Sequence, residues 1–170
     1  DDKKEVSDSY GDIVGIEEQG NSLTVICENK VLSTYVGATE YQDAQGNPQV
    51  VTSDRVLGYL RPLLGDYGTF LKESICNNGE YIYFLDVRNG CFIRKTVNGI
   101  FPISGKVQTG GYEYDYKMHT YFKNKCKALM ESYYDQGSGS VSIDDYSIRE
   151  YVKVFTGYDN EYKNLYVTFW

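Results

Sequence analysis

The fold is decided by residues 81–96, which read YIYFLDVRNGCFIRKT. Both ends of this segment are rich in aromatic and β-branched residues, which favour strands. Between them stands Asn89-Gly90, the strongest short signal for a hairpin, because both turn residues need or tolerate a positive φ. The segment therefore predicts two antiparallel strands, 81–86 and 91–96. A second Asn-Gly pair at 98–99 then turns the chain into a further strand, 100–104.

Runs of the same design stand on either side of this hairpin, each a short apolar strand followed by a Gly- or Asn-containing turn. They predict strands at residues 13–16, 23–28, 31–36, 148–156 and 165–170. We therefore expect a mainly β chain of short antiparallel meanders, arranged like propeller blades or like a sandwich.

One segment has the period of a helix. From 117 to 133 the apolar side chains recur at steps of three and four, which predicts one amphipathic helix. Residues 39–53 and 105–111 read as loops, and Gly157 begins a turn. Residues 55–64 read as a short helical or irregular stretch, limited by Pro62.

The chain has the size of one domain. Its 170 residues suffice to bury roughly two-thirds of the unfolded surface. We expect a flexible, polar segment over residues 1–11 and a single β-rich domain over 12–170. The polar start without methionine and the apolar strand at the end lead us to expect a piece excised from a longer chain.

The charge balance is acidic, with 17 Lys+Arg against 24 Asp+Glu and a net charge of −7. Because duplex binding depends on cations that neutralise phosphates, we expect no sequence-specific contact with DNA. No run approaches the roughly 20 apolar residues of a membrane span. The four cysteines are widely spaced and form no CxxC pair, so we expect reduced thiols and no metal or other cofactor.

Tyrosine is the unusual component, with 18 copies. It favours strands and supplies stiff contact area at interfaces. We therefore expect assembly and packing surfaces on two tyrosine-bearing strands, carried by Tyr81, Tyr83, Asp86, Arg94, Tyr151 and Phe155. Asp86 and Arg94 are expected to form a cross-strand pair that fixes the register.

Catalytic patterns are missing from the sequence. The single histidine, His119, has no nucleophile and orienting carboxylate around it in a triad pattern, so we expect no enzyme. Two alternatives stay open. One is a carbohydrate- or receptor-binding β-domain that uses Tyr112, Tyr114, Tyr116 and Tyr158. The other, ranked third, is a glycosidase-like enzyme with Asp144 and Asp145 as its carboxylates.

Four segments of the second β block carry a family resemblance. Residues 71–75, 79–86, 90–94 and 98–104 read LKESI, GEYIYFLD, GCFIR and NGIFPIS. Together they resemble the muzzle, or DNA-stabilisation, proteins that close the short tail of crAss-like bacteriophages. These proteins are similar in role to the nozzle proteins of other short-tailed phages. The resemblance is best from about residue 65 to the end.

The resemblance implies a role in a virion assembled in the bacterial host cytoplasm. It implies a ring of identical subunits around a channel through which DNA leaves. The partners would be other copies or neighbouring tail proteins, with DNA passing by without specific binding. An acidic, tyrosine-rich domain fits this position, since the negative charges of the protein and of the DNA repel each other and prevent tight binding of the genome.

Overall fold

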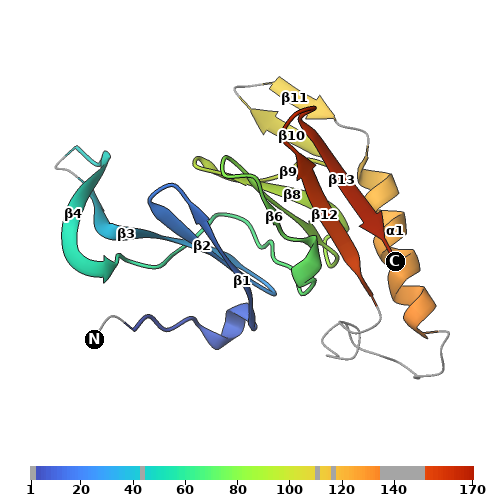
Figure 1. Ribbon diagram of the computed structural model, residues 1–170, viewed down its shortest axis with the longest axis horizontal. Coiled ribbons are helices and arrows are strands. Elements are labelled where there is room, and N and C mark those ends of the chain that lie inside the picture. The colour runs from blue at the N-terminus through green and yellow to red at the C-terminus, as the bar shows by residue number, and fades with distance from the viewer. Residues whose placement is uncertain (1–2, 43–44, 110–111, 116–117, 135–151) are drawn as a thin grey trace. The chain divides into compact units, whose positions relative to one another are not determined.

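The computed structural model describes residues 3–42, 45–109, 112–115, 118–134 and 152–170, and it confirms the prediction of a mainly β chain (Figure 1). The strands pair antiparallel in open sheets, and the described residues include a single α-helix. The chain divides into two compact units, Asp1–Gly68 and Thr69–Trp170. The expectation of one domain from residue 12 onward stays a prediction, because two compact units can still unfold cooperatively.

Unit 1 contains one five-stranded sheet in the order β1-β2-β3-β4, with β5 paired to β3. Its elements are η1 (Asp8–Tyr10), β1 (Ile13–Gln19), β2 (Ser22–Cys27), β3 (Val31–Gln42), β4 (Pro48–Leu57) and β5 (Arg61–Pro62). A small core joins Val25, Cys27 and Leu32. Val6 and Tyr10 pack against it, so part of the segment that we expect to be flexible lies on the sheet.

One loop prediction in unit 1 is wrong, and the prediction of a helical or irregular stretch over residues 55–64 holds only for its irregular parts. Residues 39–53 do not form a polar loop, because β3 continues to Gln42 and pairs with β4 from Pro48 onward. Residues 55–64 are not helical, because β4 runs to Leu57 and Arg61–Pro62 pairs with β3. Val50 and Val51 are exposed on this hairpin. A strand that is solvated on both faces has the polar composition of a loop, which explains the error.

Unit 2 holds a four-stranded sheet in the order β6-β7-β8-β9 and two separate two-stranded ribbons, β10-β11 and β12-β13. Its elements are η2 (Lys72–Ser74), β6 (Cys76–Asn77), β7 (Ile82–Asp86), β8 (Cys91–Thr96), β9 (Gly99–Pro102), β10 (Lys106–Thr109), β11 (Tyr112–Asp115), α1 (His119–Tyr134), β12 (Val154–Asp159) and β13 (Asn164–Phe169). The meander β7-β8-β9 and helix α1 are thus confirmed. The loop predicted over 105–111 is wrong, since β10 begins at Lys106.

The last hairpin is shifted from its prediction. The described part of the expected strand 148–156 is only its end, and β12 continues through Gly157 to Asp159. The turn therefore lies at residues 160–163, where the Asp159 carboxylate accepts hydrogen bonds from the backbone N–H groups of Glu161 and Tyr162. An Asp that bonds forward in this way starts a turn. The glycine stands inside the strand instead.

One hydrophobic cluster of unit 2 lies on the face of the four-stranded sheet that carries Phe92. Phe92 of β8 contacts Phe122 of α1, with ring centroids 5.5 Å apart, and Phe122 also contacts Phe169 of β13 at 6.1 Å. Val154 of β12 belongs to the same cluster and is fully buried. Helix α1 and the β12-β13 ribbon therefore share this face and contact each other (Figure 1). Because every residue of β7 is buried, this strand is the centre of the unit.

Two buried serines complete the ladder of this sheet. The Ser74 hydroxyl accepts a hydrogen bond from the Leu85 N–H at 3.2 Å and donates one to the Leu71 carbonyl at 2.8 Å. On the other side, the Ser104 hydroxyl accepts from the Phe92 N–H at 2.8 Å. Buried backbone donors require partners. The serines supply them where the short outer strands do not.

Candidate functional site

Residues from three elements form a tyrosine–arginine cluster, made of Tyr81, Tyr83, Arg94 and Tyr158. The rings of Tyr83 and Tyr158 stack nearly parallel, with centroids 5.9 Å apart and 12° between their planes. Tyr81 meets Tyr83 edge to face at 6.1 Å. The Arg94 guanidinium carbon lies 5.0 Å from the centre of the Tyr81 ring, which is the geometry of a cation–π contact.

Local structure explains why these side chains meet. Tyr83 of β7 stands directly opposite Arg94 of β8, so both side chains project from the same face of the sheet. Tyr81 precedes β7 and is held by the turn before it, where the Asn78 side chain accepts a hydrogen bond from the Tyr81 N–H at 2.7 Å. Tyr158 comes from the half-buried face of β12. Three of these residues, Tyr81, Tyr83 and Arg94, are predicted from the sequence as assembly residues. Tyr158 is predicted as a ligand-binding residue, and the structure brings all four together.

Arg94 is the electrostatic feature of the cluster. Its Nε is buried and finds no hydrogen-bond partner among the residues that the structure describes. Leaving a buried donor unpaired costs about 1–3 kcal/mol. The stacking on Tyr81 offsets about 0.5–2 kcal/mol of that cost. No described residue forms an ion pair with the Arg94 guanidinium. A half-buried cation without an anion is therefore present in the cluster.

Two tyrosines of the cluster, Tyr81 and Tyr83, have raised pKa values. A hydrogen bond to the Glu80 carboxylate raises the pKa of Tyr81, and burial raises the pKa of Tyr83. Both phenols therefore keep their protons at neutral pH, which leaves Arg94 and the Glu80 carboxylate as the charges at this place. No group here is arranged as a nucleophile with its base.

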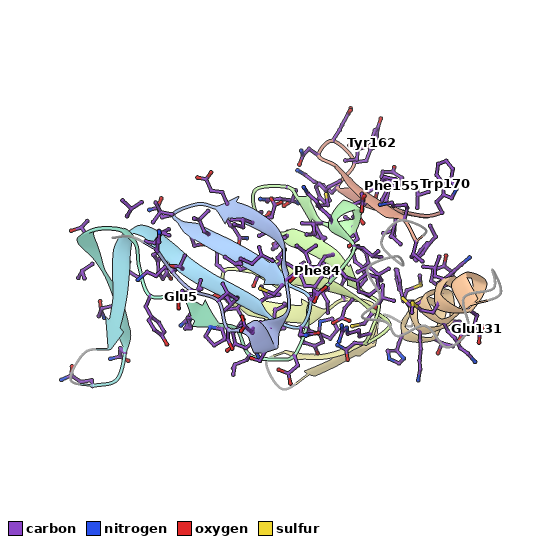
Figure 2. The ribbon with its side chains drawn as sticks, turned by 90° about the horizontal axis from the view of Figure 1, so that it is seen from below. Glu5, Phe84, Glu131, Phe155, Tyr162 and Trp170 are labelled. Atoms are coloured by element: carbon purple, nitrogen blue, oxygen red, sulfur yellow. The ribbon has the colours of Figure 1, made fainter. Side chains whose placement is uncertain are left out.

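A second feature is the outer aromatic face, formed by Phe155, Tyr166 and Trp170 on the solvent side of the β12-β13 ribbon. Their side chains are 45%, 57% and 84% exposed. Phe155 lies opposite Thr168 and Tyr166 lies opposite Gly157, while paired backbone hydrogen bonds place Trp170 opposite Lys153. Positions two residues apart along a strand share one face, so the three rings line up. Figure 2 shows Phe155 and Trp170 on this hairpin, with the exposed Tyr162 at its turn.

Gly157 has no side chain, so the solvent face of the ribbon is open at the position opposite Tyr166. An added Cβ at this position would meet nothing within 4 Å. The amide of Asn164 donates a hydrogen bond of 3.4 Å to the hydroxyl of Tyr166. The hydroxyl of Tyr166 is therefore held by Asn164, and the space around Gly157, its cross-strand neighbour, is open.

The predicted pair of Asp86 with Arg94 is wrong. The register sets Asp86 opposite Cys91 and Arg94 opposite Tyr83, so the two side chains are three positions apart on opposite faces. Asp86 accepts hydrogen bonds from the backbone N–H and side-chain amide of Asn89, at 2.9 and 2.8 Å. This carboxylate therefore fixes the hairpin turn.

The described contacts of these two features include none of the remaining predicted residues. Tyr112 and Tyr114 belong to β11, and Tyr116, Tyr151, Asp144 and Asp145 lie outside the described residues. Sequence reasoning missed Tyr166 and Trp170 as members of one face. The signal was available, because Tyr166 and Trp170 stand at alternate positions of the last strand, on the face opposite Val167 and Phe169.

The four cysteines form no disulfide with one another, and three of them are buried. Burial raises the pKa of Cys27 to about 11 and that of Cys91 and Cys126 to about 12. Over the described parts of the chain, no three His, Cys, Asp or Glu side chains gather as metal ligands do. Helix α1 is too short and too polar to cross a membrane, and no other described helix does better.

Comparison of the chain with protein-family models, with curated proteins and with solved structures found no match.

Proposed function

We propose that this chain is a structural domain of a phage tail muzzle or nozzle assembly. In this role the outer aromatic face contacts neighbouring copies or adjoining tail proteins around a DNA exit channel. The observation that carries the proposal is the exposure of Phe155, Tyr166 and Trp170 on one side of a single ribbon. Interface cores are enriched in such residues and depleted of charge.

The energetics favour covering this face. Burying one large apolar side chain fully is worth about 1.5–3 kcal/mol. Rings that are stiff lose little entropy when they become fixed, so three of them suit a central contact patch. Between Leu165 and Trp170 the chain carries no charged residue, although the whole protein has a net charge of −7. Two acidic copies therefore repel each other least along this strand.

The tail assignment itself rests on the resemblance of residues 71–104 to muzzle proteins. Those residues form η2, the meander β6-β9 and both ladder-completing serines, so the resemblance falls on the structural core of unit 2. The acidic balance supports a wall past which DNA moves without being held.

The single tryptophan makes the proposal measurable. Trp170 is the only tryptophan of the chain and is 84% exposed, so its emission in the dilute protein is that of a solvated indole. We expect the emission to shift to the blue as protein concentration rises, in step with an increase in mass by sedimentation. Phe155→Ser should weaken this association at least tenfold, since it removes the central ring of the face.

Tyr59→Ser is the matched control, because Tyr59 is a single exposed aromatic residue of unit 1 outside this face. Trp170→Ser is followed by sedimentation alone. A protein that remains a monomer with solvated tryptophan at high concentration, also when mixed with muzzle-type tail proteins, would contradict the proposal.

A carbohydrate-binding domain is the second candidate. It is favoured by the open space beside Tyr166 and by the amide of Asn164 at its tip, because sugars stack on aromatic rings and bond to nearby amides. A glycan array probed with the monomeric protein tests it. Selective binding that is lost in Tyr166→Ala would favour this candidate over the structural role.

A further inference from the structure

We propose that Arg94 and the tyrosines around it form a binding site for an oxyanion, a carboxylate or phosphate group. The site is distinct from the outer aromatic face, and the inference does not rest on the proposed function. It starts from the Nε atom of Arg94, a buried hydrogen-bond donor for which the described residues supply no acceptor. Such a group in a folded protein calls for a ligand, ion or water as its partner.

The orientation of Arg94 favours an in-plane ligand. The guanidinium stacks over the Tyr81 ring at 5.0 Å, which occupies a face of the planar group. Its N–H bonds point outward along the edge of that plane, and stacking leaves this edge for an acceptor. A carboxylate or phosphate matches the edge with two parallel hydrogen bonds, to Nε and to one Nη.

The surroundings strengthen this preference. Tyr83 stands opposite the arginine and Tyr158 stacks on Tyr83, and these packed rings lower the local dielectric. Tyr81, Arg94 and Tyr158 are only partly buried, so a ligand can reach the rim of the cluster, whereas Nε itself is covered. A charge-assisted hydrogen bond gains strength in such a place.

One group opposes an anion here. The exposed Glu80 carboxylate accepts a hydrogen bond from the Tyr81 hydroxyl and lies next to the cluster. Its negative charge lowers the affinity for a second anion. Removing the charge of the exposed Glu80 should therefore tighten the binding of an anion.

The experiment follows the Arg94 Nε–H resonance by NMR in the full chain. The resonance is assigned by its loss in Arg94→Lys, which keeps the charge and removes the nitrogen. Sodium phosphate and sodium acetate are titrated separately at constant ionic strength set with chloride. We expect a saturable shift of the Arg94 resonance with at least one of them, and only proportional, unsaturated shifts at Arg88.

Variants decide the outcome. Arg94→Gln should weaken binding at least tenfold, read from the amide resonances of Tyr83 and Tyr158. Arg88→Gln, the same change at an exposed position of the same hairpin, should leave binding unchanged. Glu80→Gln should tighten binding several-fold, and it keeps the inference testable if Arg94→Gln does not fold.

Preference for phosphate would indicate a free or nucleic-acid phosphate as the source, and preference for acetate an acidic side chain of a partner. Shifts that never saturate in wild type and in Glu80→Gln would overturn the inference. That result would leave the outer aromatic face and its test untouched.

Discussion

At the residue scale, the sheet of unit 2 depends on hydroxyl groups that have no apolar substitute. Ser74 is fully buried and both donates and accepts, so its single oxygen joins η2 to the central strand β7. A methyl group in its place would leave the Leu85 N–H buried without an acceptor. This is a costlier change than the small loss of volume suggests.

We therefore expect Ser74→Ala to lower the free energy of unfolding by about 1–3 kcal/mol. Chemical denaturation followed by circular dichroism measures it. Ser9→Ala removes a hydroxyl that bonds only to Ser7 at the surface, and it should change stability by less than about 0.5 kcal/mol. Equal effects of the two substitutions would show that the buried hydrogen bonds of Ser74 contribute no more to the free energy of unfolding than the surface hydrogen bond of Ser9.

The thiols give a second residue-scale prediction. Cys27, Cys91 and Cys126 are buried, and their raised pKa values keep them protonated at pH 8. Since the thiolate is the reactive form, we expect a thiol reagent to modify the native protein at one position, the partly exposed Cys76. The other three should react only in denaturant. Cys76→Ala should abolish the fast phase, and a fast phase that survives would contradict the burial of the other thiols.

At the scale of elements, one ion pair joins segments that are far apart in the chain. Lys153, just before β12, contacts the carboxylate of Glu73 in η2 at 2.8 Å, and each side chain is about one-third exposed. The hydrogen bond from Lys153 is the main cause that lowers the pKa of Glu73. This contact anchors the start of the ribbon that carries the outer aromatic face.

The sign of the pH dependence follows from that lowered pKa. A carboxyl group with a lower pKa in the folded state stabilises the fold above its unfolded pKa, near 4.5, and this stabilisation is lost as the pH falls through the folded value. We expect Glu73→Gln to cost about 0.5–1 kcal/mol at pH 7, after solvent screening, and much less at pH 2.

A double-mutant cycle with Lys153→Met measures the coupling of this pair. The exposed pair Lys127–Glu131, at 3.4 Å within α1, is the control and should couple by no more than about 0.5 kcal/mol. A Glu73–Lys153 coupling that is no larger than this and does not change with pH would contradict the prediction.

At the scale of the whole molecule, net charge and the outer aromatic face act against each other. Copies with a charge of −7 repel at low salt, while burial of the face attracts. Salt shortens the screening length from about 10 Å at 0.1 M to about 3 Å at 1 M. We therefore expect added sodium chloride to strengthen self-association several-fold, as measured by sedimentation. Association that weakens with salt would indicate pairing of opposite charges instead.

Much of the secondary structure was predictable because local signals agreed with the fold. Residues 81–96 carry a strong turn signal between strongly β-favouring runs, and the predicted hairpin is the centre of unit 2. Helix α1 was predictable because its apolar side chains recur at helical steps, and Phe122 and Cys126 are buried as that pattern requires. The exposed hairpin β3-β4 was missed because a polar composition is typical of exposed strands as well as of loops.

The candidate site could be predicted only in part. Tyrosine enrichment on the strands pointed to Tyr81 and Tyr83, but pairing Asp86 with Arg94 required a register that the sequence does not contain. A shift of one residue moves a side chain to the other face of a sheet. The alignment of Phe155 with Trp170 likewise depends on β12 continuing past Gly157, where a turn was expected.

By itself, the sequence determined that this chain is mainly β, with an Asn-Gly hairpin, one amphipathic helix and an acidic, tyrosine-rich surface. These properties follow from local propensity, periodicity and composition, which act over a few neighbouring residues. Only the tertiary structure decided that Arg94 stacks on Tyr81 with no charged partner among the described residues, and that three aromatic rings share the solvent face of the last ribbon. Both depend on strand register, and the cluster depends also on the stacking of Tyr83 with the distant Tyr158, which local signals do not encode.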